Sequence, residues 1–289
     1  MALQEYPLFI DGKPSPAAGG EWFDTVNPYT GEVWARIAKG GKADVDRAVA
    51  AAKAALAGEW GRMTPTARGK LMRRLGDLVS EHAESLARTE VRDNGKLYAE
   101  MLGQTRYHAE WWYYFGGLAD KIQGDVVPID KPDLLTFTTS EPVGVVAALT
   151  AWNSPLLFVA WKCAAAIAAG CTVVLKPSEF TSASTLEFAE LTRQAGFPDG
   201  VFNVVTGFGA DVGASLVSHP DVAKVTFTGS EVTGAAVYQA AAKGLKRVSL
   251  ELGGKSPNIV FEDADLDLAV SGAISGIFAA TGQTCVAGS

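Results

Sequence analysis

From residue 143 onward, the chain alternates between short apolar runs rich in Val and longer stretches that suit helices. Parallel strands need crossover connections of about a dozen residues or more, usually helical, and they are apolar throughout because both sheet faces are buried. The alternation therefore predicts an α/β fold, a Rossmann-like parallel sheet with helices on both faces. The predicted strands are residues 143–149, 172–175, 201–205, 224–227, 247–250 and 258–261.

The first part of the chain has a different pattern. Residues 1–40 combine Gly and Pro with short apolar runs, which predicts short strands and turns. Two helices are expected to follow. Asp44 is expected to cap the first, and Thr64, with Pro65 at the first helical position, is expected to begin a second that reaches about Val91.

An aromatic helix and a hairpin come next. Asp93-Asn94-Gly95 is a stop signal, and residues 98–121 are expected to form the aromatic helix. Two strand-like runs within residues 124–142 flank a polar turn, and the prolines there indicate an edge or a protruding arm. The expected parts are N-terminal strands and helices at 1–123, the hairpin at 124–142, the Rossmann-like region at 143–252 and a short C-terminal part at 253–289.

Charge and composition argue against several classes of protein. The 289 residues have a formal net charge of -7 and scattered basic residues, which argues against nucleic acid as the main partner. No apolar stretch reaches the roughly 20 residues that span a bilayer, and the N-terminus lacks a signal-peptide pattern. The three cysteines have no CxxC spacing and the three histidines are isolated. These patterns favour a cytoplasmic protein without a metal site.

Three turns at predicted strand ends have the composition of nucleotide-binding loops. Thr228-Gly229-Ser230 leads from a strand into a helix start, which would offer backbone N–H groups to a phosphate, although an ordinary helix cap is the alternative. Lys176 and Glu179 suit two ribose hydroxyls, the lysine as donor and the carboxylate as acceptor, with a solvated loop as the alternative. Gly207 to Gly213 places its third glycine one position late for a dinucleotide fingerprint, so we interpret it as a turn before a helix.

Three side chains suit attack by a thiol on a carbonyl. Cys285 stands in a Gly- and Thr-rich turn, where we expect a helix that covers the sheet to meet the turn. Glu251 ends a predicted strand, where partial burial would raise its pKa toward that of a useful base. The amide of Asn153 can donate to an oxyanion. The alternatives are an inert cysteine and a helix cap at Asn153.

Five motifs then occur in a fixed order. They are Ala151-Trp152-Asn153-Ser154-Pro155, Lys-Pro-Ser-Glu at 176–179, Phe-Thr-Gly-Ser from 227, Glu-Leu-Gly-Gly-Lys-Ser-Pro-Asn from 251 and Gly-Gln-Thr-Cys ending at 285. Together with the aromatic helix and the hairpin, they resemble the aldehyde dehydrogenase superfamily. The resemblance covers essentially the whole chain, and five ordered motifs are far more specific than any one of them.

The resemblance implies two-step oxidation of an aldehyde to a carboxylic acid. Cys285 would attack the aldehyde to give a thiohemiacetal, and Asn153 with the backbone N–H of Cys285 would stabilise the oxyanion. Hydride transfer to the nicotinamide would leave a thioester. Glu251 would then activate water for hydrolysis, which argues against the branch of the family that acylates CoA. Lys162 matches a helix lysine implicated in proton relay.

The resemblance also implies a dinucleotide site. Lys176 and Glu179 would hold the adenosine ribose, and NAD is favoured because a carboxylate would repel the 2′-phosphate of NADP. Lys176 beside Ser178 leaves some tolerance for NADP. The other positions implied are Trp152 and Ser230 at the pyrophosphate, Gly209 at the adenine and Leu252 near the nicotinamide, with Thr150, Phe227, Gly229 and Gly253 around them.

The sequence ends four residues after Cys285, inside a family motif. We therefore expect the whole protein to be longer, with the catalytic domain largely absent from this chain. An alternative of another class is a short nucleotide-binding or assembly module without turnover. For the complete enzyme, the resemblance implies a small-molecule aldehyde as substrate and a homodimer or homotetramer formed through the 124–142 hairpin. The sequence does not identify the aldehyde.

Overall fold

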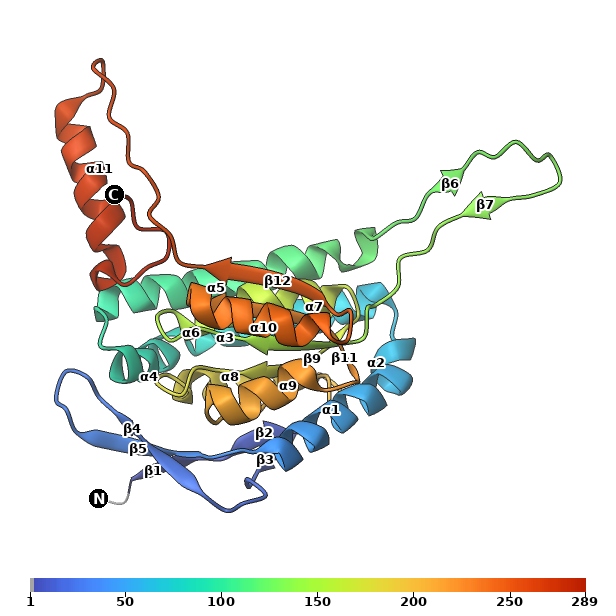
Figure 1. Cartoon of the computed structure of the whole chain (residues 1–289), viewed down its shortest axis with the longest axis horizontal. Coiled ribbons are helices and arrows are strands. Elements are labelled where there is room, and N and C mark those ends of the chain that lie inside the picture. Colours follow the sequence, from blue (N-terminus) through green and yellow to red (C-terminus); the bar gives the residue numbers. More distant parts are fainter. Residues whose placement is uncertain (1–2) are drawn as a thin grey trace.

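A seven-stranded sheet forms the centre of the computed structural model, which describes residues 3–289 (Figure 1). The strand order is β12-β11-β8-β9-β10-β2-β3. The first five strands are parallel, and β2 and β3 add an antiparallel edge. The predicted α/β fold is confirmed. The bounds are β2 (Leu8–Ile10), β3 (Lys13–Ser15), β8 (Val145–Leu149), β9 (Thr172–Lys176), β10 (Phe202–Val204), β11 (Val222–Gly229) and β12 (Arg247–Leu252).

Helices cover both faces of this sheet (Figure 1). Val173 and Leu175 of β9 belong to one apolar core and Val174, between them, belongs to the other, as the two-residue period of a strand requires. All five β9 residues are buried, which explains the continuous apolar run. One face carries α1 (Lys42–Ala57), α9 (Ala214–Ser218) and α10 (Glu231–Ala242), and the other carries α3 (Pro65–Glu81), α4 (Ala83–Asn94), α5 (Tyr98–Leu118), α6 (Pro155–Val159), α7 (Ala165–Ala168) and α8 (Ala183–Gln194).

The N-terminal helices begin and end largely at the predicted signals. Thr64 caps α3 by accepting a hydrogen bond of 3.3 Å from the N–H of Ala67. Gly95 ends α4 in the left-handed conformation, with φ at 71°. The continuous helix predicted to reach Val91 was wrong, because the chain breaks at His82. There the hydroxyl of Ser85 donates to the His82 carbonyl at 2.9 Å, and α4 starts anew.

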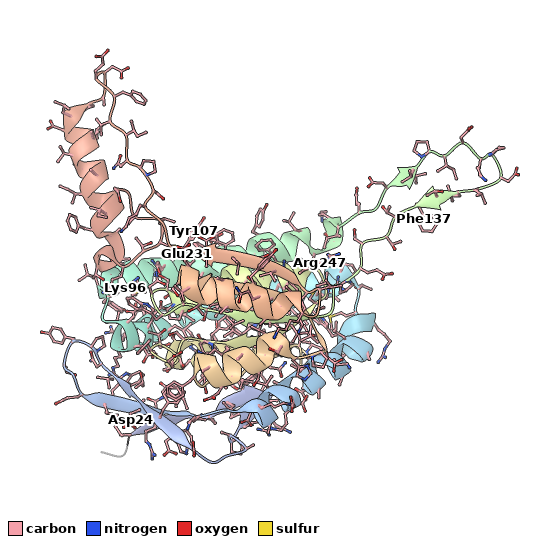
Figure 2. All side chains as sticks on the ribbon, in the orientation of Figure 1. Asp24, Lys96, Tyr107, Phe137, Glu231 and Arg247 are labelled. Atoms are coloured by element: carbon pink, nitrogen blue, oxygen red, sulfur yellow. The ribbon has the colours of Figure 1, made fainter. Side chains whose placement is uncertain are left out.

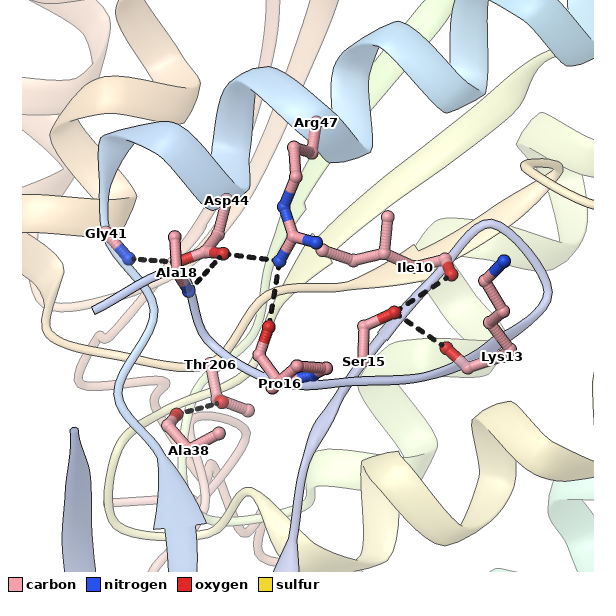
Figure 3. Close-up of polar contacts among 10 residues, drawn as sticks. All are labelled: Ile10, Lys13, Ser15, Pro16, Ala18, Ala38, Gly41, Asp44, Arg47 and Thr206. Carbon is pink, nitrogen blue, oxygen red and sulfur yellow. Dashed lines mark hydrogen bonds and ion pairs between the residues drawn. The ribbon is translucent and has the colours of Figure 1, made fainter. Parts of the chain in front are cut away.

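Asp44 stabilises the start of α1 in a different way from the one predicted. The helix begins after Gly41, and Asp44 occupies its third position, where it accepts the Gly41 N–H at 2.9 Å (Figure 3). It also accepts the N–H of Ala18 at 3.0 Å and pairs with Arg47 at 2.6 Å. One buried carboxylate therefore joins the helix start to the segment that follows β3.

Residues 4–38 form short strands, as predicted. A second sheet has the order β1-β5-β4, in which β1 is parallel to β5 and β4 is antiparallel to it. The remaining short elements lie between the larger ones. Their bounds are β1 (Gln4–Tyr6), β4 (Trp22–Val26), β5 (Val33–Ala38), α2 (Glu59–Arg62) and the short helical turns at Ala119–Lys121, Ala160–Ala164, Gly209–Gly213 and Ala279–Gly282.

Two parts of the chain project from the sheet and its helices (Figure 1). The predicted hairpin is present as an arm with strands β6 (Val126–Val127) and β7 (Thr136–Phe137). Away from the arm stands α11 (Leu266–Phe278), which has no buried residue, so the prediction of a sheet-covering helix before Cys285 was wrong. Within residues 3–289, we find no helix with the length and apolar character needed to cross a bilayer.

The strand predicted at residues 258–261 is also absent. In this region Ser256 forms an isolated bridge with Gly288, and the N–H of Asn258 donates to the carbonyl of Ser289 at 2.8 Å. A β-strand is stable only where a neighbouring strand accepts and donates backbone hydrogen bonds along its length. The described residues supply no such neighbour here, and the apolar side chains of Ile259 and Phe261 are exposed.

Candidate active site

A cleft of about 800 Å³ opens where parallel strands of the large sheet end. The chain order reverses at β8, since β9 follows it on one side and β11 pairs with it on the other. Open α/β sheets bind ligands at such a reversal, beyond the carboxyl ends of the strands. The cleft is lined by twelve of the predicted site residues, namely Thr150, Trp152, Asn153, Lys176, Glu179, Gly209, Phe227, Gly229, Ser230, Leu252, Gly253 and Cys285.

The end of β9 places a donor and an acceptor side by side in this cleft. Lys176 Nζ lies 2.7 Å from Glu179 Oε2, and Lys176 is only 5% exposed. A solvated loop would leave the ammonium in water, so the structure rejects that alternative. Because one N–H of the Lys176 ammonium donates to Glu179, the pair leaves two N–H groups and the remaining acceptor sites of the carboxylate at one wall of the cleft.

The end of β11 leads directly into α10. Ser230 caps this helix by accepting the Thr233 N–H at 3.2 Å, so the capping interpretation is correct and coexists with a place in the cleft. The hydroxyls of Thr150 and Thr228 also lie at strand ends in this cleft. Both are buried, and neither has a protein hydrogen-bond partner. Buried hydroxyls seldom stay unpaired, so this wall suits a polar ligand.

The glycine-rich segment before α9 also contributes to the cleft. Residues Gly209–Gly213 form a wide helical turn that continues into α9, as the interpretation of a turn before a helix predicts. A Cβ added at Gly209 would meet nothing within 4 Å, so the cleft is open at this point.

Asn153 contacts the segment that carries Cys285. Its Nδ2 donates a hydrogen bond of 2.9 Å to the backbone carbonyl of Gln283. The helix α6 begins two residues later, at Pro155, with Ser154 at its N-cap position, so the capping alternative for Asn153 is wrong. The contact spans 130 positions of sequence and brings the amide and the cysteine loop to one cleft.

The three cysteines lie in distinct environments. Cys163 and Cys171 are buried, whereas Cys285 is half-buried and lines the cleft. Burial raises the pKa of the Cys163 thiol far above its ordinary value. Of the three, only Cys285 combines access to the cleft with polar neighbours such as Thr284.

Glu251 and Lys162 do not line the cleft. Glu251 is exposed on β12, so the predicted partial burial was wrong. The reason is that β12 is an edge strand and that little of the described chain covers it. Lys162 is half-buried, and its Nζ donates to Thr226 Oγ1 at 3.2 Å. Burial lowers the pKa of Lys162 to about 8, while the charges of Cys163 and Glu251 act in the opposite sense.

The sequence interpretation missed Lys96. It is only 2% exposed, and its Nζ donates to the Gln283 carbonyl at 3.4 Å, the same oxygen that Asn153 contacts. The one local feature that marks Lys96 is its position directly after the Asp93-Asn94-Gly95 stop. A charged residue after a helix end is ordinarily exposed to solvent, so this feature did not indicate burial.

Residues 15–289 match the sequence profile of the aldehyde dehydrogenase family. The chain belongs to that family. Among curated relatives, the aldehyde dehydrogenase of Enchytraeus buchholzi is 48% identical over 286 residues, which are 98% of this chain and 57% of the relative. The (Z)-2-((N-methylformamido)methylene)-5-hydroxybutyrolactone dehydrogenase of Acinetobacter baylyi is 50% identical over 288 residues, which are 99% of this chain and 59% of the relative.

Solved aldehyde dehydrogenase structures show the same fold. The NAD⁺ complex of the aldehyde dehydrogenase from Bacillus cereus matches with a TM-score of 0.96 at 46% identity, over 98% of this chain and 58% of that one. An NADP-dependent enzyme of E. coli matches with a TM-score of 0.96 at 41% identity, over 99% and 59%. The present chain thus spans less than two thirds of the length of these relatives.

Proposed function

We propose that the whole protein containing this chain oxidises an aldehyde to a carboxylic acid with NAD as the electron acceptor. One observation carries the proposal. A single cleft is lined both by Cys285 with Asn153 and by the Lys176–Glu179 pair, so a thiol nucleophile and a nucleotide site share one cavity. Hydride transfer from a thiol adduct to a dinucleotide needs that proximity.

The cleft residues fit NAD. Lys176 and Glu179 would contact the adenosine ribose, and Ser230 at the start of α10 would face the pyrophosphate. The unpaired hydroxyls of Thr150 and Thr228 offer further donors at the strand ends. NAD, when bound, supplies the acceptor for the hydride. The remaining proposed contacts are Trp152, Gly209, Phe227, Gly229, Leu252 and Gly253.

Asn153 and Cys285 would carry the first step. The Cys285 sulfur attacks the aldehyde carbon, and negative charge gathers on the carbonyl oxygen. An Asn amide has two N–H bonds. Because one bond of Asn153 is directed at the Gln283 carbonyl, the other is left to stabilise the oxyanion together with the backbone N–H of Cys285.

Glu251 and Lys162 would serve the second step. We assign to Glu251 the removal of a proton from the water that hydrolyses the thioester. Lys162, whose pKa is lowered to about 8 by burial, is suited to pass that proton outward, with the Thr226 hydroxyl fixing its ammonium. A Cβ at Gly253 or Gly254 would meet nothing within 4 Å, so the segment after Glu251 has room to move.

The projecting hairpin would join two copies of the protein. Its apolar side chains are exposed, with Val126 and Leu135 each 74% exposed and Phe137 60% exposed. Exposed apolar surface on a protruding arm marks an association site. We propose a homodimer or homotetramer formed through residues 124–142.

Formation of NADH tests the function. The whole protein would be assayed with NAD and with short aliphatic, long aliphatic and aromatic aldehydes, and Cys285→Ala would be the matched control. Aldehyde-dependent NADH formation that disappears in the variant supports the proposal. Binding of NAD with no turnover on any aldehyde would instead favour the nucleotide-binding module, and absence of NAD binding would reject both.

A further inference from the structure

The C-terminal segment, residues 253–289, is joined to the preceding part of the protein at one place. Within residues 3–289, three hydrogen bonds make this connection. They are Ala280 N–H to Glu100 Oε2 at 3.0 Å, Lys96 Nζ to the Gln283 carbonyl at 3.4 Å and Asn153 Nδ2 to the same carbonyl at 2.9 Å. All three end on residues 280–283, here called the nucleophile loop, which immediately precedes Thr284 and Cys285.

The nucleophile loop has an unfavourable backbone conformation. Ala280 and Thr281 have φ angles of 55° and 57°, in the left-handed region that costs a residue with a Cβ about 1–2 kcal/mol. Two such residues in succession persist only where surrounding contacts favour them. Within the loop, Thr281 Oγ1 and the Gln283 N–H donate to the Ala280 carbonyl at 2.7 and 3.0 Å, and the three hydrogen bonds to Lys96, Glu100 and Asn153 add support from outside the loop.

Lys96 is held firmly on its own side of the contact. Gly95 turns the chain in the left-handed conformation, and Asn94 Oδ1 accepts the Lys96 N–H at 3.0 Å. Burial lowers the pKa of the Lys96 ammonium, while Glu90 and Glu100 act in the opposite sense. Figure 2 shows Lys96 below the foot of α11. Burying an ammonium costs free energy unless it is paired. The Lys96 ammonium donates to the Gln283 backbone carbonyl, which indicates that it holds this carbonyl in place.

We propose that Lys96 and Glu100 are positioning residues for the nucleophile loop. Glu100 fixes the start of the loop through the Ala280 N–H. Lys96 fixes the Gln283 carbonyl, and thereby the direction in which Asn153 donates. The Gln283 carbonyl oxygen thus positions both Asn153, the proposed oxyanion donor, and the loop that carries Cys285. This inference rests on the role proposed above for Cys285, although its geometric part can be tested separately.

Hydrogen exchange and kinetics of the whole protein test the inference. Lys96→Met, Lys96→Arg and Glu100→Gln would be compared with the parent and with Lys70→Met, which changes an exposed lysine on α3. In Lys96→Met we expect amide exchange in the peptide 279–287 to rise about tenfold. We also expect kcat to fall at least about tenfold, because small misplacements of reacting groups are costly.

Three readouts separate positioning from a general loss of stability. The Kd for NAD and the KM for the aldehyde should stay within about twofold of the parent, because the Lys176 end of the cleft is untouched. Lys96→Arg should recover part of kcat, since it keeps a donor. Unchanged exchange in 279–287 for both Lys96→Met and Glu100→Gln would overturn the inference, as would a fall in thermal stability with no effect specific to that peptide.

The outcomes also separate this inference from the proposed function. If the parent oxidises no aldehyde, the proposed function fails, and exchange in peptide 279–287 still decides whether Lys96 and Glu100 position the loop. If Lys96→Met does not fold, Glu100→Gln carries the exchange test, because it keeps the shape of the half-buried side chain but replaces the charged acceptor of the Ala280 N–H with a weaker neutral one.

Discussion

The ammonium of Lys176, the last residue of β9, and the carboxylate of Glu179, three residues later, lie 2.7 Å apart in the cleft. The lysine is buried and the glutamate is half-buried. The pair therefore fixes one negative charge at the proposed ribose position. A 2′-phosphate brought there would meet that charge at short range in a partly dry environment.

We expect Glu179→Ser to reduce the preference for NAD over NADP. Removal of the carboxylate relieves repulsion of the 2′-phosphate and frees Lys176 to contact it. The ratio of kcat/KM for the two cofactors should shift toward NADP by at least about tenfold, or about 1.4 kcal/mol. The control is Glu190→Ser, which breaks a similar pair with Arg193 on the surface of α8. An unchanged ratio would remove Glu179 from the ribose site.

Cys285 is expected to be the thiol that alkylating agents modify in the folded protein. Cys163 and Cys171 are buried, and burial raises the pKa of Cys163. Mass spectrometry after brief iodoacetamide treatment should find the label on Cys285. Cys285→Ser should lower kcat at least about a thousandfold while NAD still binds, because loss of a nucleophile leaves the binding site intact. Comparable labelling of Cys163 would contradict this assignment.

His108 should make stability depend on pH below neutrality. It is fully buried, Trp112 Nε1 donates to its Nε2 at 3.0 Å, and burial lowers its pKa from 6.5 to about 3. The neutral ring is thus favoured in the folded state. Its contribution is complete above pH 6.5 and is lost as pH falls toward 3, because the unfolded chain binds the proton first.

The loss due to His108 should approach about 1.4 kcal/mol per pH unit between about pH 6 and pH 4. Urea unfolding of the parent and of His108→Gln across this range measures it as a difference between the two slopes. Trp112→Phe is the control, since it removes the hydrogen bond but keeps the titrating ring. Parallel stability curves for the parent and His108→Gln would show that the ring titrates normally.

The hairpin should determine the oligomeric state. Phe137 on β7 is 60% exposed on the projecting arm (Figure 2). Phe137→Asp would place a charge in the proposed contact, and burying an unpaired charge is costly. Light scattering should then show a smaller assembly of the whole protein. Tyr29→Asp, at a 91% exposed position in the β4–β5 loop, should leave the mass unchanged. Equal masses for parent and Phe137→Asp would argue against association through the arm.

The sequence predicted the sheet and the cleft well because both depend on local patterns. Strands such as β9 are buried on both faces, so Val173 to Leu175 form a continuous apolar run that is recognisable in the sequence. Parallel strands end at one edge of the sheet. Thr150, Lys176 and Ser230 each follow a strand, so their convergence followed from their positions alone.

Predictions that depended on distant contacts were less accurate. Residues 258–261 have the composition of a strand, but a strand needs a partner, and Ser256 finds only Gly288. The contact between Lys96 and Gln283 spans 187 positions, and no local pattern indicates it.

Helix α11 has 13 residues, carries Asp267, Ser271 and Ser275 among mostly apolar and glycine residues, and buries none of them. A helix of this length is marginal by itself in water, because most helical stability comes from tertiary packing. In this chain, the residues that lead to Cys285 therefore belong to a segment that opens readily. The large sheet gives the nucleotide wall a rigid frame, whereas the placement of the thiol depends on the few hydrogen bonds that residues 280–283 make. The two halves of one cleft thus differ in local stability, and heat or denaturant should separate loss of chemistry from loss of nucleotide binding.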